Sequence, residues 1–281
     1  MNTHLSQLVM IMAQLRGPDG CPWDRQQTHE TLKPYLLEET YEALEAIDNQ
    51  NPSALKEELG DVLLQVIFHA QIAEEQSAFT LEDVAYTLSQ KLIRRHPHVF
   101  DPQKHSEVKT ALDVANKWET IKQQERETST THPSVLDGIP RTAPALQRAY
   151  QAQKRAAKNG FDWTSIAPVL EKLREECQEL CAAMTTLTEE TKTSSPTDSL
   201  KQKQADVEDE FGDVLFSCVN MARFLKVNPE DSLRRATNRF MTRFRYVEER
   251  ALETSQLLSQ CSEATLDQWW EEAKSLERKN L

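Results

Sequence analysis

A short sequence pattern occurs twice in this chain. The segment ELGDVLLQVIFHA at residues 58–70 aligns with EFGDVLFSCVNMA at residues 210–222. Upstream of each copy, the acidic pattern Glu-Glu-x-x-Glu occurs at residues 38–42 and again at residues 175–179. Matches that keep the same order indicate an internal duplication. The chain is therefore expected to contain two copies of one structural unit.

Helical periodicity runs through both copies, and glycine is scarce, with 6 among 281 residues. We predict an all-α fold of two tandem helical bundles: a domain over 1–126, a linker rich in Thr and Pro over 127–143, and a domain over 144–281. Residues 185–204 lack apolar periodicity and are predicted to form a mobile loop. The predicted helices span residues 3–16, 30–48, 53–75, 80–95, 107–126, 144–158, 166–184, 206–225, 230–250 and 265–278.

The net charge limits the classes of partner, and the cysteines indicate the cellular compartment. The net charge of −12 argues against nucleic acid or an anionic membrane surface as the main partner. Residues 3–16 form an amphipathic pattern rather than a signal peptide, and no apolar run is long enough to span a membrane. The five cysteines form no CxxC motif. We therefore expect reduced thiols in a cytoplasmic protein.

The acidic residues lie on segments that are otherwise strongly apolar. After Glu58, residues 59–68 are nearly all apolar, which predicts a helix buried on most sides. Glu58 and Asp61 lie one turn apart on that helix, and no Lys or Arg follows before His69. Buried carboxylates require a positive partner, so a divalent metal is predicted.

The preceding helix supplies further carboxylates from Glu38, Glu39 and Glu42. A short connection makes the two helices antiparallel, so these oxygens can converge with those of Glu58 and Asp61. Oxygen ligands without His or Cys suit Mg²⁺, with Mn²⁺ as an alternative, and such a metal can bridge to phosphate.

The acids allow two other interpretations. A di-iron bundle needs a His three residues after a Glu, but Glu45, Asp61 and Ala182 occupy the corresponding positions. A solvated acidic face fits Glu45, but it does not fit the acids of the apolar segments. Those acids are Glu58, Asp61, Glu210 and Asp213.

Basic and aromatic residues also recur in both copies. Lys91 and Arg95 in the first copy match Arg239 and Arg243 in the second, each pair one helical turn apart. Such a pair can clamp phosphate oxygens or lie on a solvated face. The tryptophans can stack on a base or fill a core.

Together the motifs resemble the all-α nucleoside triphosphate pyrophosphohydrolases of the MazG family. The motifs that carry the resemblance are the GCPWD loop, the LLEETYE helix, the RRHPHVF segment, the GFDW turn and the EFGDVLF helix, within residues 5–278. The resemblance implies hydrolysis of nucleoside triphosphates to monophosphate and pyrophosphate. It also implies Mg²⁺ dependence, broad base tolerance, a homodimer, a housekeeping role, and most of the activity in the C-terminal copy.

Residue roles follow from the same resemblance. The metal ligands would be Glu176, Glu179, Glu210 and Asp213. Glu175 or Glu176 would orient or deprotonate the attacking water, and Lys172, Arg239 and Arg243 would hold the phosphates. Trp270 takes the position of an aromatic residue beside the base. In the N-terminal copy Leu36 is assigned to the position of Lys172, so this copy is expected to be weak or regulatory.

Two alternatives remain open at this point. A helical interaction protein with decayed sites would fit the duplicated unit, although intact acids in both copies argue against it. A relative specific for dUTP or dCTP would share the acidic pattern. The sequence does not identify the preferred nucleotide, a protein partner or the copy that forms the dimer.

Overall fold

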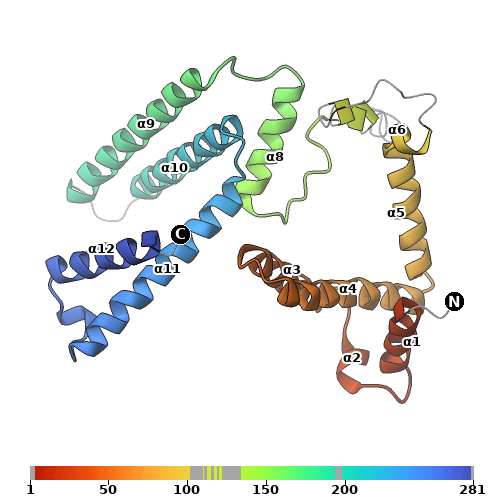
Figure 1. Cartoon of the computed structure of the whole chain (residues 1–281). Helices are drawn as coiled ribbons and strands as arrows, with labels where there is room; N and C mark the ends of the chain where they lie inside the picture. Colours follow the sequence, from red (N-terminus) through yellow and green to blue (C-terminus); the bar gives the residue numbers. More distant parts are fainter. Residues whose placement is uncertain are drawn as a thin grey trace. The chain divides into compact units, whose positions relative to one another are not determined.

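The computed structural model describes residues 4–101, 110, 113–114, 117–118, 120–121, 134–193 and 198–279 (Figure 1). Helices are the only regular secondary structure in these ranges, which confirms the all-α prediction. The chain divides into two compact units, Met1–Glu125 and Arg126–Leu281. Within the described ranges, no helix combines the length and apolarity needed to cross a membrane.

The N-terminal unit contains α1 (His4–Arg16), α2 (Pro22–Gln26), α3 (Lys33–Asp48), α4 (Pro52–Glu75), α5 (Leu81–Arg95) and α6 (Pro97–Phe100). The tight connection between α3 and α4 makes them an antiparallel hairpin. The Asn51 side chain caps α4 by accepting hydrogen bonds from the backbone N–H groups of Ser53 and Ala54. A capping box begins α5, where Thr80 and Asp83 bond each other's backbone N–H groups. The helix predicted over 107–126 falls largely outside the described residues.

The core of this unit lies between α1 and the C-terminal half of α4. It contains Met12, Leu32, Ile67, Phe68 and Ile72. The prediction that residues 59–68 are buried on most sides is wrong within a single chain. Four apolar residues of this stretch are exposed, and no helix among the described residues of the unit covers them: Leu59, Leu63, Leu64 and Val66.

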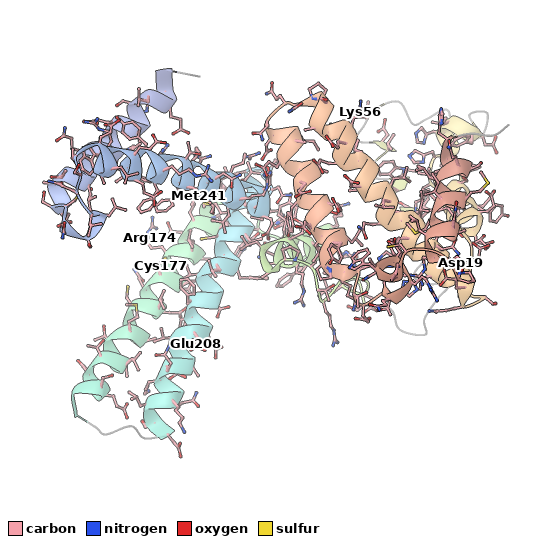
Figure 2. The ribbon with its side chains drawn as sticks, turned by 90° about the horizontal axis from the view of Figure 1, so that it is seen from below. Asp19, Lys56, Arg174, Cys177, Glu208 and Met241 are labelled. Atoms are coloured by element: carbon pink, nitrogen blue, oxygen red, sulfur yellow. The ribbon has the colours of Figure 1, made fainter. Side chains whose placement is uncertain are left out.

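The C-terminal unit contains α8 (Ala145–Lys158), α9 (Ile166–Thr193), α10 (Asp198–Phe224), α11 (Pro229–Glu253), η1 (Leu258–Gln260) and α12 (Glu263–Lys279). The long helices α9 and α10 run side by side as the counterpart of the α3–α4 hairpin (Figure 2). α8 packs on α10, and α12 packs on α11 around Val247, Ala251 and Trp269.

The mobile loop predicted over 185–204 is a mistaken prediction, because α9 continues to Thr193 and α10 begins at Asp198. Threonine hydroxyls in this part of α9 donate to the carbonyl four residues earlier, for example Thr185 to Cys181 at 2.8 Å and Thr188 to Met184 at 2.8 Å. These bonds satisfy the hydroxyls within the helix. A pair of helices that is exposed on most sides needs few apolar residues at helical spacing. The sequence of this segment therefore showed no helical periodicity.

Candidate active site

The α9–α10 hairpin brings three carboxylates together. Glu176 and Glu179 lie one turn apart on α9, and Glu210 faces them from α10. One oxygen of each lies within 4.8 Å of the others, and Glu176 is 6% exposed. In Figure 2, Cys177 marks α9 one residue after Glu176, and Glu208 marks α10 shortly before Glu210. We name Glu176, Glu179 and Glu210 the C-terminal cluster.

Lys172 supplies the positive charge of this cluster. Its Nζ lies 2.9 Å from Oε1 of Glu175 and 2.9 Å from Oε1 of Glu176. The hydrogen bond with Glu175, followed by that with Glu176, raises the pKa of Lys172. The buried carboxylate of Glu176 therefore has a cation beside it.

The α3–α4 hairpin repeats the arrangement. Oxygens of Glu39, Glu42 and Glu58 lie within 4.8 Å of one another, and we name these residues the N-terminal cluster. Burial, followed by the charges of Asp61 and Glu42, raises the pKa of Glu39. Burial also raises the pKa of Glu58, with the charges of Glu42 and Asp61 as further causes.

The charge balance of the two clusters differs. In the C-terminal cluster, burial and then Glu176 raise the pKa of Glu179, and Lys172 opposes that rise. The causes that raise the pKa values of Glu39 and Glu58 are burial and neighbouring acids, with no opposing lysine among them. The two clusters therefore share their geometry but differ in the charges that surround the carboxylates.

The assignment of Leu36 to the position of Lys172 is wrong by one residue. Lys172 contacts the acids three and four residues ahead of it. The same spacing before Glu38 and Glu39 leads to Tyr35, whose ring packs edge-on against Trp23 at a centroid distance of 5.8 Å. The conclusion that the N-terminal copy lacks the lysine is unchanged.

The predicted fourth ligands lie beside the clusters rather than within them. Asp213 is exposed on α10, one turn beyond Glu210, and is not among the oxygens that meet within 4.8 Å. Asp61 holds the matching place on α4, and its charge acts on both Glu39 and Glu58. Glu38 also acts on Glu39.

Apart from Lys172, the predicted phosphate-binding residues lie on helices other than those that carry the clusters. Arg239 is exposed on α11, whereas Arg243 pairs with Glu277 of α12 at 2.6 Å. The Arg243 guanidinium also lies 5.8 Å from the ring centroid of Trp270, which in turn packs against Phe240 at 5.2 Å. In the N-terminal unit, Lys91 is exposed and Arg95 is half-buried on α5.

The chemistry of both clusters suits a hard divalent cation. Mg²⁺ binds oxygen at about 2.0–2.1 Å, so opposite ligands of one ion lie about 4.2 Å apart. The carboxylate oxygens of each cluster already meet within 4.8 Å. Small side-chain adjustments would therefore bring them onto one ion while leaving positions for water or phosphate.

Sequence reasoning missed a group of polar residues in the C-terminal unit. Gln153 of α8 and Asn220 and Arg223 of α10 line a cavity next to the GFDW turn. Asn220 and Arg223 lie three residues apart on a helix that is apolar nearby, a spacing that could have drawn attention to them.

The fold and the clusters define an all-α protein in which a group of three carboxylates, of the kind that could hold a metal ion, occurs twice. The sequence matches the MazG nucleotide pyrophosphohydrolase domain twice, over residues 27–100 and 164–247. The chain therefore belongs to the MazG family, and each match contains one cluster.

Two relatives match almost the whole chain, and a third matches just over half of it. A MazG nucleoside triphosphate pyrophosphohydrolase/pyrophosphatase of Thermotoga maritima is 47% identical over 95% of this chain and 94% of its own length. A nucleoside triphosphate pyrophosphohydrolase of Escherichia coli K12 is 40% identical over 97% of this chain and 98% of its own length. One from Mycobacterium tuberculosis is 43% identical over 56% of this chain and 46% of its own length.

Proposed function

We propose that this protein hydrolyses nucleoside triphosphates to nucleoside monophosphate and pyrophosphate at the C-terminal cluster. The observation that carries the proposal is the meeting of three carboxylates within 4.8 Å beside Lys172. Relatives that match the chain end to end have names that state this activity. Mg²⁺ is the proposed cofactor, and Mn²⁺ is an alternative.

Each residue of the cluster has a role in this proposal. Glu176, Glu179 and Glu210 would hold the cation, and Asp213 could join them by a side-chain rotation. When bound, the cation would offset phosphate charge and lower the pKa of a water molecule. Glu175 is exposed next to the cluster, so its carboxylate can orient the attacking water or accept its proton.

The cations would act on the phosphates. Lys172 would transfer its contacts from the carboxylates to the pyrophosphate that leaves. Arg239 and Arg243 are also proposed to bind the leaving pyrophosphate. Arg243 would have to exchange its contact with Glu277 for a phosphate oxygen. Trp270, beside Arg243, remains a proposed contact of the nucleotide.

Incubation with dATP or dCTP and Mg²⁺ tests the activity. We expect one pyrophosphate for each monophosphate, and a loss of at least about 100-fold in kcat for Glu210→Gln, because a metal ligand is removed. Absence of pyrophosphate at every Mg²⁺ and Mn²⁺ concentration would favour an interaction protein with decayed sites. A panel of nucleotides then tests the proposed broad specificity, and strong preference for dUTP or dCTP would contradict it.

We propose that the N-terminal cluster has weak hydrolytic activity or a regulatory role, because it lacks a counterpart of Lys172. The double variant Glu38→Ala/Asp61→Ala should retain most of the turnover, whereas Glu210→Ala should not. The reverse result would assign catalysis to the N-terminal copy.

We also propose a cytoplasmic homodimer with a housekeeping role on the nucleotide pool. The dimer is supported by apolar residues exposed at equivalent places on α4 and α10: Leu59 and Leu63 on α4, and Phe211 and Leu215 on α10. Gly60 and Gly212 lie in the same helices, where an added Cβ would meet no atom within 4 Å. A second chain covering these faces would account for both features.

A further inference from the structure

A hollow of about 470 Å³ at the C-terminal ends of α8 and α10 is lined mainly by cations. Lys154 and Lys158 border it from α8, and Arg223 and Lys226 border it from the end of α10. We name this space the basic hollow. Tyr150 supplies an aromatic wall, and the Lys154 ammonium lies 5.9 Å from the centroid of its ring. Positive charges from two helices therefore meet in one place.

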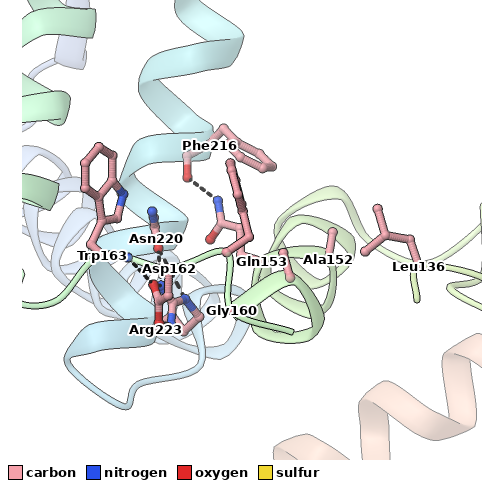
Figure 3. A pocket seen from close by; sticks show the side chains of 11 residues that line it. Leu136, Ala152, Gln153, Gly160, Asp162, Trp163, Phe216, Asn220 and Arg223 are labelled. Atoms are coloured by element: carbon pink, nitrogen blue, oxygen red, sulfur yellow. Dashed lines mark hydrogen bonds and ion pairs between the residues drawn. The ribbon is translucent and has the colours of Figure 1, made fainter. Parts of the chain in front are cut away.

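The basic hollow is separate from the cavity that Gln153 lines. The two spaces share only the ion pair of Asp162 and Arg223, in which Nη1 donates to Oδ2 at 2.9 Å (Figure 3). Lys158 projects from α8 at about 200° from Ala156, which lines the cavity. The hollow and the cavity therefore lie against opposite faces of α8.

The sequence concentrates positive charge here, against the charge of the whole chain. Residues 138–161 contain five Lys or Arg side chains and no Asp or Glu, although the net charge of the chain is −12. One of the five, Arg155, donates to the backbone carbonyl of Asp137 at 2.5 Å. Lys154 and Lys226 have no carboxylate partner among the residues that the structure describes. Their charges are therefore available to a ligand.

The ends of the two helices do not account for these cations. At both ends, backbone N–H groups beyond the helix already donate to carbonyls of its last turn, which is the Schellman pattern. The four donors are Gly160, Phe161, Lys226 and Val227. Each helix end contributes about half a negative charge. Four cations, offset by Asp162 and by the two helix ends, leave a net charge of about +2 at the hollow.

Arg223 is fixed in place and retains one donor. Its side chain is 14% exposed in the ion pair with Asp162. Four of its five N–H groups donate to the oxygens of Asp162 and Asn220. The fifth N–H, on Nη1, remains for a ligand. The hollow thus combines one positioned guanidinium with three lysines.

We infer that the basic hollow binds a small anion of the phosphate class that carries two or more negative charges. A phosphate group carries nearly two negative charges at pH 7, which match the net charge of the hollow. Its oxygens can accept from cations on different helices, and lysine binds phosphate as a point charge. Arg223 lies 13 residues beyond Glu210, about 20 Å along α10, so one phosphate chain cannot contact both. The inference therefore goes beyond the proposed function and does not depend on it.

Lysine acetylation, read residue by residue with mass spectrometry, tests binding in the full chain. Inorganic pyrophosphate is the probe, and EDTA keeps metal ions from the carboxylate clusters. The acetylation rates of Lys154 and Lys226 should fall at least about threefold as pyrophosphate saturates the site. Lys201, whose side chain is 84% exposed on α10, should react at an unchanged rate. Unchanged rates at Lys154 and Lys226, or an equal fall at Lys201, would overturn the inference.

Paired charge removal tests whether the hollow acts as one site. In Lys154→Gln/Lys226→Gln, pyrophosphate should no longer protect Lys158, because the net charge of the hollow falls from about +2 to about zero. Lys33→Gln/Lys201→Gln removes two charges at exposed positions elsewhere and should keep the protection. Circular dichroism should match the wild type in both variants. Protection that persists in Lys154→Gln/Lys226→Gln would contradict the inference.

Two further measurements define the ligand class and separate the hollow from catalysis. Citrate, whose charges lie on carboxylates, should protect Lys154 less than pyrophosphate does at the same ionic strength, and equal protection would contradict the phosphate class. Lys154→Gln/Lys226→Gln should keep kcat/KM for dATP within about twofold of the wild type. A loss as large as that of Glu210→Gln would place these lysines in the catalytic site and overturn the separate site. If pyrophosphate protects Lys154 but no triphosphate is hydrolysed, the proposed function fails and the inference stands.

Discussion

His69 of α4 forms a pair with His29 that has no counterpart in the C-terminal unit, where Met221 takes its place in the repeat. The two Nδ1 atoms are 2.8 Å apart and the rings stack at 5.1 Å. Burial, followed by the charge of His29, lowers the pKa of His69 from 6.5. The unfolded chain therefore takes up a proton before the folded chain does, and the free energy of unfolding should decrease as the pH falls below about 6.5.

Chemical denaturation at pH 7.5 and pH 5.5 checks this prediction. The wild type should lose more stability between these values than His69→Phe, which has no group to protonate. His4→Gln, at an exposed position, should behave as the wild type. Equal losses in the wild type and His69→Phe would show that the pair does not control the pH response.

The ionised carboxylate of Glu58 lowers the stability of the fold, because it lies among other acids. Its pKa is raised above the usual value of 4.5. The protonated form therefore contributes stability at pH values below 4.5, and this contribution is lost as the pH rises, so that the ionised form opposes folding at pH 7.5. Glu58→Gln should raise the thermal midpoint of the metal-free protein at that pH. It should also reduce the midpoint increase caused by Mg²⁺ in the N-terminal unit by more than half. Glu74→Gln, exposed on the same helix, is the control in calorimetry.

At the scale of elements, the two hairpins differ in length beyond their clusters. α3 ends at Asp48 and α4 begins at Pro52, whereas α9 continues to Thr193 and α10 begins at Asp198. When the two repeats are aligned, Asp48 corresponds to Thr185 and Pro52 corresponds to Gln204. The additional turns of α9 and α10 therefore lie outside the part of the hairpin that builds the site.

Replacing residues 186–203 by the short Asn-Gln-Asn turn of the first hairpin tests this interpretation. Because the clusters lie on the retained turns, kcat/KM should stay within about twofold of the wild type, and the helical circular dichroism signal should fall in proportion to the deleted residues. A larger loss of activity would mean that the extension contributes to the site.

At the scale of the whole molecule, the exposed faces of α4 and α10 determine the expected assembly. Leu63→Lys or Leu215→Lys should convert a dimer into a monomer in light-scattering measurements, because a charge cannot be buried in an apolar interface without a partner. The variant that has this effect would also identify the unit that forms the contact. Leu252→Lys, at a position 76% exposed near the end of α11, is the control. A wild type that is monomeric at every concentration would contradict the proposed homodimer.

Much of the fold could be predicted from the sequence because the signals are local. The apolar spacing within each predicted helix and the recurring acidic motifs are read from short segments, and they led to the hairpins and the acids that meet in both clusters. The extension of α9 could not be predicted in this way, because its hydrogen bonds are satisfied within the helix and its side chains face solvent on most sides.

By itself, the sequence determined that this protein is helical and duplicated, and that acids occur one turn apart on each hairpin. Only the tertiary structure decided which acids meet, that Asp213 lies outside the C-terminal cluster, and that Lys172 pairs with Glu176. It also decided that Gln153 Oε1 is left without a donor at the cavity. The physical reason is range: periodicity and capping act over a few residues, whereas charge pairing and hydrogen-bond satisfaction depend on atoms brought together from different helices.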